Sequence, residues 1–130
     1  MKKILIQLAI LIPVMAYGQG INKFNYNVDG KPTSSFTGAD SENYTFKHYY
    51  SNGVKSETGI FKDGVKHGVW KTWDETGKLT SVAHYKNGEK TGKWLIKNET
   101  DNTTFEISFN HNHMLHALKK DNHGHVVAKR

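Results

Sequence analysis

The chain has 130 residues, no cysteine and a formal net charge of +6 at pH 7. This length is typical of one domain, and the lack of cysteine excludes a disulfide framework, a thiolate metal site and a cysteine nucleophile. The lysines are interspersed along the chain instead of clustered, a pattern typical of solvated strand faces and guarded sheet edges. We therefore expect no nucleic-acid partner, because proteins that bind nucleic acid usually have their basic residues clustered in one patch.

The amino-terminal segment has the pattern of a secretory signal peptide. Two lysines precede an apolar run over residues 4–14, which is too short to span a bilayer comfortably. Small residues at Ala16 and Gly18 predict cleavage before Gln19, so residues 1–18 are expected to leave the chain. A short membrane anchor and a buried first helix are the alternatives. With cleavage, the protein is secreted or held in the periplasm or on the surface of a bacterium, and no transmembrane segment remains.

The remaining residues, 19–130, form one predicted repeat domain. Positions recur at a spacing of 24 residues, clearly over about 43–95 and in eroded form over about 97–128, which indicates about four units. A fixed spacing of this kind is the signature of a repeat architecture. The recurring structural residues are Gly53 with Gly77, Gly64 with Gly88, Gly68 with Gly92, Trp70 with Trp94, and Tyr85 with Phe61 and Phe109.

Each unit reads as two short strands and two turns. Val69–Trp73 is rich in aromatic and β-branched residues, and residues 78–85 alternate between apolar and polar side chains, as half-buried strands do. The pairs Asp63–Gly64 and Asn87–Gly88 are strong signals of two-residue hairpin turns. In the eroded unit, Asn110–Asn112 contains no glycine, which predicts a looser turn.

Because 24 is even, residues one unit apart face the same side of a pleated sheet. Two rows of bulky side chains would then share one face: Phe61–Tyr85–Phe109 and Phe46–Trp70–Trp94–Leu118. No segment shows sustained helical periodicity, and no further apolar row supplies a second layer. The predicted fold is all-β: an elongated single-layer antiparallel β-meander of tandem hairpin repeats of about 24 residues, stabilised mainly by contacts between neighbours.

Two stretches, residues 49–70 and 73–94, carry a pattern of aromatic residues and glycines that resembles the MORN repeat variant. This form occurs in bacterial proteins often labelled as antitoxin components. The resemblance implies an extended row of β-hairpins used as a binding or scaffolding surface, and related MORN repeats are associated with protein and membrane-lipid contacts. In the eroded unit, Asn112 and His116 stand where the other units have glycine, so this end is expected to cap the array.

We expect a non-enzymatic protein without a cofactor that contacts another protein or a cell-envelope component through a sheet face. A glycan- or lipid-binding module is the first alternative, and an antitoxin-like neutralising partner of a toxin is the second. Self-association through the apolar face also stays open. An enzyme is disfavoured because no serine lies in a G-x-S-x-G elbow and a single-layer sheet offers no deep cleft for paired carboxylates.

The candidate binding residues are Trp73, Tyr49, Lys71 and Lys97. Trp73 lies three positions after Trp70, so the two side chains face opposite sides of a regular strand. Trp73 shares its repeat position with Tyr49 and Lys97, which favours Trp73 as the more exposed tryptophan. Exposed aromatic side chains beside lysines suit glycan stacking, lipid headgroups or protein hot spots. The simpler interpretation is that each aromatic residue only stabilises the sheet.

Five of the eight histidines lie within residues 111–125. His111 and His113 would share a face if both lay on one strand, and they would then offer two imidazoles to Zn²⁺, Ni²⁺ or Cu²⁺. A closed site needs four ligands in fixed geometry, and no carboxylate lies close in sequence to the histidine pair. We therefore predict solvated histidines and no metal site.

Overall fold

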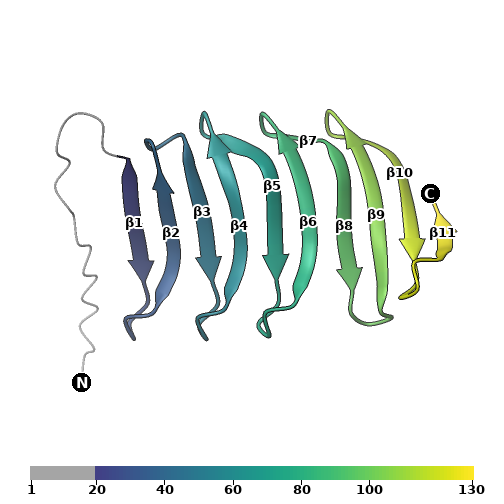
Figure 1. Cartoon of the computed structure of the whole chain (residues 1–130), viewed down its shortest axis with the longest axis horizontal. Helices are drawn as coiled ribbons and strands as arrows, with labels where there is room; N and C mark the ends of the chain where they lie inside the picture. The colour runs from purple at the N-terminus through teal and green to yellow at the C-terminus, as the bar shows by residue number, and fades with distance from the viewer. Residues whose placement is uncertain (1–19) are drawn as a thin grey trace, which may run out of the picture.

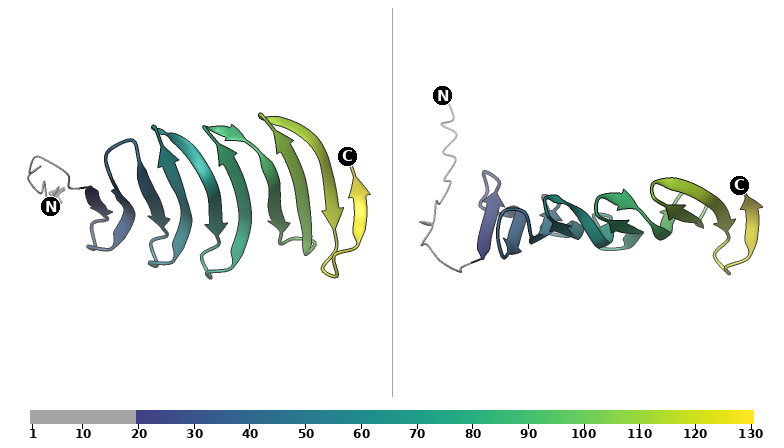
Figure 2. Two further views of the ribbon diagram at one scale, coloured as in Figure 1. Left: turned by 45° about the horizontal axis from the view of Figure 1, so that its top comes forward. Right: turned by 90° about the horizontal axis from the view of Figure 1, so that it is seen from above.

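The computed structural model describes residues 20–130, and the predicted signal peptide lies outside the described residues. The described residues form one antiparallel sheet of 11 strands and contain no helix. Each strand pairs with the next in the order β1-β2-β3-β4-β5-β6-β8-β9-β10-β11, and the short β7 pairs with β6. The strands lie side by side along the long axis of the molecule (Figure 1), and the sheet is one layer thick when seen from above (Figure 2). The predicted all-β single-layer meander is therefore confirmed.

The strands have the following bounds: β1 Ile21–Tyr26, β2 Pro32–Gly38, β3 Tyr44–Tyr49, β4 Lys55–Lys62, β5 Val65–Trp73, β6 Leu79–Lys86, β7 Glu89–Lys90, β8 Gly92–Asn98, β9 Thr103–Asn110, β10 His113–Lys120 and β11 Val126–Lys129. The sequence indicates about four units. The structure has a further hairpin, β1–β2, before the region in which the 24-residue recurrence is found. That hairpin lacks most of the glycine and aromatic signature of the other units, although its strands pair in the same antiparallel manner.

Four turns at the lower end of the sheet in Figure 1 share one hydrogen-bond pattern: β1–β2, β3–β4, β5–β6 and β10–β11. In the β5–β6 turn, the Asp74 N–H donates to the Lys78 carbonyl at 2.9 Å, and the Gly77 N–H donates to the Asp74 carbonyl at 3.0 Å. Gly77 has φ 87°, in the left-handed region that side chains disfavour. The Asp74 carboxylate also accepts the Thr76 and Lys78 N–H groups, each at 2.9 Å. Recurrence of this turn explains the spacing of Gly53 and Gly77.

Three of the upper turns, β4–β5, β6–β7 and β9–β10, consist of two residues with positive φ. Asn87 and Gly88 have φ 49° and 82°, and His111 and Asn112 have φ 45° and 66°. The prediction of a looser turn without glycine is therefore wrong. Asparagine tolerates the left-handed region. Asn112 also forms two hydrogen bonds with the backbone of Lys90 on β7. Its N–H donates to the Lys90 carbonyl at 3.0 Å, and its Oδ1 accepts the Lys90 N–H at 2.8 Å.

One face of the sheet, here called the aromatic face, carries a continuous series of rings whose neighbouring centroids lie 5.0–6.4 Å apart. Trp70 at its centre is 3% exposed and is the buried hydrophobic residue of the described chain. Because no second layer covers the sheet within residues 20–130, the rings bury one another, and such pairs each contribute about 0.2–1 kcal/mol. The series consists of Phe36, Phe46, Phe61, Trp70, Tyr85, Trp94 and Phe109.

The predicted extension of the tryptophan row to Leu118 is wrong. Trp94 pairs with Ile107 on β9, and on the other side of β9 Ile107 pairs with Ala117. Leu118 pairs instead with Glu106 and so faces away from Trp94. The aromatic face therefore continues through Ala117, and the series of rings ends at Phe109.

Leu118 faces the other side of the sheet because the eroded unit lacks a glycine that the other units have. Gly68 and Gly92 have φ 70° and 62° and lie where two extra residues enter β5 and the β7–β8 segment. In the eroded unit, His116 replaces this glycine, and the register between β9 and β10 shifts by one residue instead of two. A one-residue difference in register exchanges the two faces of a strand.

Candidate functional site

The face opposite Trp70 is crossed by one row of directly paired residues that runs from edge to edge of the sheet. We call this row, together with the residues two positions away on the same strands, the lysine face. The spacing of two keeps each side chain on one side of the sheet. The row consists of Phe24, Ser35, Lys47, Thr58, Lys71, Val82, Leu95, Glu106, Leu118 and Lys129.

Two lysines on the aromatic face, Lys66 and Lys90, contact rings. The Lys66 Nζ lies 3.9 Å from the Trp70 ring centroid, and the Lys90 Nζ lies 5.2 Å from that of Trp94. Lys66 also forms a 3.3 Å ion pair with Glu57. A cation over a ring is attracted by the negative face of the π system. These two lysines therefore contribute to the stability of the sheet through their contacts with its rings.

Lysines on the lysine face are mostly available to a partner. Lys47, Lys71 and Lys97 are exposed, and within residues 20–130 they form neither an ion pair nor a ring contact. Because these side chains lie on one side of the sheet, their positive charges act together on a partner that approaches that side.

Glu106 forms ion pairs with two lysines of the lysine face, Lys93 and Lys120. Its carboxylate accepts hydrogen bonds from Lys120 at 2.7 Å and contacts Lys93 at 2.8 Å. Hydrogen bonds from Lys120 and Lys93 favour the charged form and lower the pKa of Glu106 to about 2. The side chain of Glu106 is 13% exposed, which is less than that of any other carboxylate in an ion pair of residues 20–130.

The predicted aromatic candidates lie at the lower end of the lysine face. Trp73 is half-buried and packs under Lys55, whose Nζ is 4.3 Å from the ring centroid. The Tyr50 hydroxyl donates to the Trp73 carbonyl at 2.8 Å. Tyr49 is half-buried on β3, opposite Lys55 of β4. Lys55 thus lies over the Trp73 ring and pairs with Tyr49 across the strands. The role of Tyr49 and Trp73 in binding stays a prediction.

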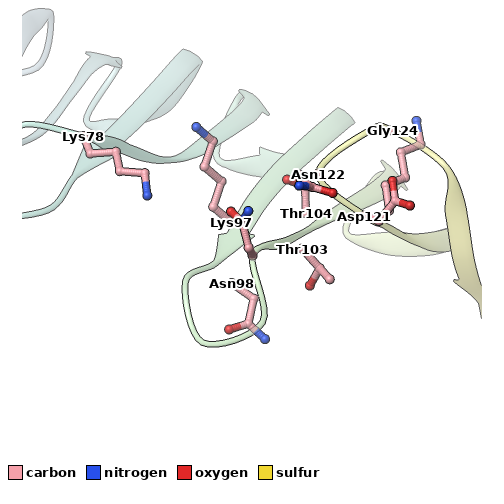
Figure 3. Close-up of a pocket in the computed structure, with 10 residues that line it drawn as sticks. Lys78, Lys97, Asn98, Thr103, Thr104, Asp121, Asn122 and Gly124 are labelled. Carbon is pink, nitrogen blue, oxygen red and sulfur yellow. The ribbon is translucent and has the colours of Figure 1, made fainter.

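Lys97 lies at the edge of a hollow of about 380 Å³ between the β8–β9 loop and the β10–β11 turn. Figure 3 shows Lys78 and Lys97 on one side of this hollow and Asp121 and Gly124 on the other. Three lysines and three asparagines contribute to its wall: Lys78, Lys97, Lys120, Asn98, Asn102 and Asn122. The hollow is therefore polar and carries more positive than negative side chains.

Asp121 is the acidic residue in the wall of the hollow. Its Oδ1 accepts the backbone N–H groups of His125 at 2.8 Å and His123 at 2.9 Å. These hydrogen bonds, led by that of His125, lower the pKa of Asp121. The carboxylate therefore serves the turn, as Asp74 does in the β5–β6 turn.

The histidines do not form the pair that a shared strand would give. His111 lies in the upper turn with φ 45°, whereas His113 begins β10. The His111 Nδ1 lies 2.6 Å from a Glu89 carboxylate oxygen. No group of three or more histidine, aspartate or glutamate side chains in residues 20–130 is arranged to hold a metal ion. The interpretation of His111 and His113 as neighbours on one strand is thus wrong, because the turn separates them.

Sequence reasoning named Lys71 and Lys97 but missed the segregation of lysines and the residues around the hollow. A signal was present, because Lys47 and Lys71 are 24 residues apart and hence share a face. Lys93 and Lys97 flank Leu95 at a spacing of two. Lys120 and Lys129 gave no such signal, since their faces depend on the shifted register of β9, β10 and β11.

These features define a class: a protein built from tandem β-hairpins in one open sheet, with a ring-lined face and a lysine-rich face. Residues 66–87 match the family described as MORN repeat variant. The matched segment covers most of β5, its turn and β6 up to Asn87, and it supports the resemblance to MORN repeats. A comparison with curated proteins gives no match. In the part of the chain that the structure covers, no helix is long and apolar enough to cross a membrane.

Proposed function

We propose that the protein is a non-catalytic, exported binding module whose lysine face docks on an acidic component of the cell envelope. The observation that carries this proposal is the separation of the lysines. Lys66 and Lys90 on the aromatic face contact rings, whereas Lys47, Lys71 and Lys97 on the opposite face are exposed. An excess of positive charge on one face attracts a partner of the opposite sign.

Exposed apolar side chains on the same face add a second attraction. Ile60 is 48% exposed, Val69 is 44% exposed, and Leu95 is 36% exposed. Each of them lies in the defining row or two positions from it. Apolar contacts flanked by polar groups are typical of interface cores. The lysine face therefore has both the charge and the apolar area that a docking surface needs.

An antitoxin-like role is a weaker candidate. Neutralisation of a cytoplasmic toxin needs a cytoplasmic protein, and the predicted signal peptide argues for export. Self-association through the aromatic face is also weaker, because its rings already contact one another and Trp70 is 3% exposed.

Sedimentation with the insoluble envelope fraction of the host tests the proposal. The variant K47E/K71E reverses two charges on the lysine face, whereas K23E/K90E makes the same change in net charge on the aromatic face. We expect the first variant to lose at least about tenfold in apparent affinity at low salt and the second to bind like the parent. Equal losses in both variants, at equal thermal stability, would show that net charge and not the face governs binding.

A further inference from the structure

The hollow lies where the repeat departs from its own pattern. Tyr49, Trp73 and Lys97 occupy one repeat position. At Trp73 an indole ring occupies this part of the lysine face, with Lys55 against it. One unit further on, Lys97 supplies no ring, and the hollow of about 380 Å³ lies beside it. A difference between otherwise similar units is where an array places its specificity.

The hollow offers hydrogen-bonding groups that the fold itself does not use. Asn102 and Asn122 line it, and within residues 20–130 their side chains form no hydrogen bond. The Asn98 Oδ1 accepts the Thr100 N–H at 3.0 Å, which leaves its amide nitrogen available. An asparagine amide both donates and accepts, so it suits the hydroxyl groups of a sugar.

The charges around the hollow favour a negative ligand. Lys97 forms no ion pair within the described chain, and Lys78 is 3.7 Å from Glu99 in an exposed pair that contributes little. Lys120 is held by Glu106. A ligand that carries one negative group therefore meets Lys97 and Lys78 without breaking a shielded pair.

We propose that this hollow binds an anionic saccharide unit, that is, a sugar that carries a carboxylate. Lys97 and Lys78 contact the negative group, and the amides of Asn98, Asn102 and Asn122 contact the hydroxyls. The volume is within the range of small-ligand sites, and no aromatic residue lines the hollow, so recognition rests on hydrogen bonds and charge. This inference rests on the proposed function, for which it names the specific contact of the lysine face with an envelope polymer.

Titration of the ¹⁵N-labelled exported protein with glucuronic acid, glucose and inorganic phosphate tests the inference. We expect glucuronic acid to shift the amide signals of residues 97–104 and 120–124, with glucose and phosphate each at least about tenfold weaker. The substitution Lys97→Gln should weaken glucuronic acid at least about fivefold. Lys47→Gln removes a charge from the same face far from the hollow and should leave the titration unchanged. Equal binding of glucose, equal binding of phosphate, or equal effects of the two substitutions would each overturn the inference.

Two further arms separate this inference from the proposed function. The variant K47E/K71E should lose envelope binding and keep the glucuronic acid titration, since neither residue lines the hollow. Vesicles that contain phosphatidylglycerol test a lipid source of the negative group. Stronger binding to these vesicles than to glucuronic acid, with the same fivefold loss in Lys97→Gln, would assign the hollow to a lipid headgroup and overturn the saccharide. Envelope docking without any glucuronic acid binding would remove the inference and leave the proposed function.

Discussion

The indole of Trp70 lies directly over Gly59 of the neighbouring strand. A Cβ atom at position 59 would overlap the Cδ2, Cε2 and Cε3 atoms of this ring. The indole N–H donates to the carbonyl of Ile60, the next residue, at 3.2 Å. Trp94 repeats the hydrogen bond one unit later, to the carbonyl of His84 at 3.0 Å. The most buried ring of the sheet thus packs against a glycine, and the hydrogen bond from its N–H to the Ile60 carbonyl orients it.

The contact predicts that Gly59→Ala destabilises the fold although its backbone conformation suits alanine. We expect a loss of about 1–3 kcal/mol, the usual effect of overpacking, because the indole must move away from Ile60. Urea unfolding followed by tryptophan fluorescence measures the change. Ile60→Val alters the adjacent exposed residue and should change stability by less than about 0.5 kcal/mol. An unchanged unfolding midpoint for Gly59→Ala would show that the ring shifts freely.

The two tryptophans of β5 should differ sharply in their contribution to stability. Trp70 is 3% exposed and contacts Phe46, Phe61 and Tyr85, whereas Trp73 is half-buried under Lys55. We expect Trp70→Ala to cost about 3–5 kcal/mol or to abolish cooperative unfolding. Trp73→Ala should cost markedly less. Equal losses in thermal unfolding would contradict the assignment of Trp70 to the core.

Much of this fold could be predicted from the recurrence of glycines and rings. The spacing of 24 residues specified the upper turns at Asp63–Gly64 and Asn87–Gly88 and the series of rings to Phe109, and the structure confirms them. Local turn chemistry and an even period were sufficient, since each element contacts its neighbours in sequence. Residues within one unit therefore carried the needed information.

The errors came from register, which local patterns do not encode. Leu118 has the spacing of the tryptophan row. The bulge near His116, however, contains one extra residue instead of two, and this difference turns Leu118 to the other face. The lysine face has the same origin, because Lys120 and Lys129 reach it only through that shift. The hollow depends on three separate segments that meet at one end of the sheet. Its residues could be found only after the strands were placed.

The upper turn at Asn112 is predicted to depend on its side chain. Asn112→Ala removes the acceptor of the Lys90 N–H and places alanine at φ 66°. Each effect costs about 1 kcal/mol, so we expect a loss of about 1–2 kcal/mol. Asn112→Gly keeps the backbone conformation and loses only the acceptor, so its loss in urea unfolding should be smaller. Equal losses in the two variants would mean that the hydrogen bond, which both variants lack, and not the left-handed backbone determines the turn.

Glu106 predicts a pH dependence of stability with a defined window. Its pKa is lowered to about 2 from 4.5, so it stabilises the fold above pH 4.5 and loses this contribution as the pH falls toward 2. Glu106→Gln should therefore be less stable than the parent at pH 7, and the two should converge near pH 2. Thermal melts from pH 7 to pH 2 measure the difference. Glu99→Gln alters a 50% exposed carboxylate in a 3.7 Å pair and should differ little from the parent throughout.

Restoring the repeat at position 97 should close the hollow. Lys97→Trp places in the third unit the ring that the second unit has at Trp73, and it removes the positive charge beside Asn98 and Asn102. We expect glucuronic acid binding to fall below detection, with folding retained because exposed aromatic residues are favoured in strands. The matched variant Lys97→Gln keeps the hollow open and should retain residual binding at least about fivefold weaker than that of the parent. Isothermal titration of the three proteins measures the order, and full binding by Lys97→Trp would show that the saccharide contacts lie elsewhere on the lysine face.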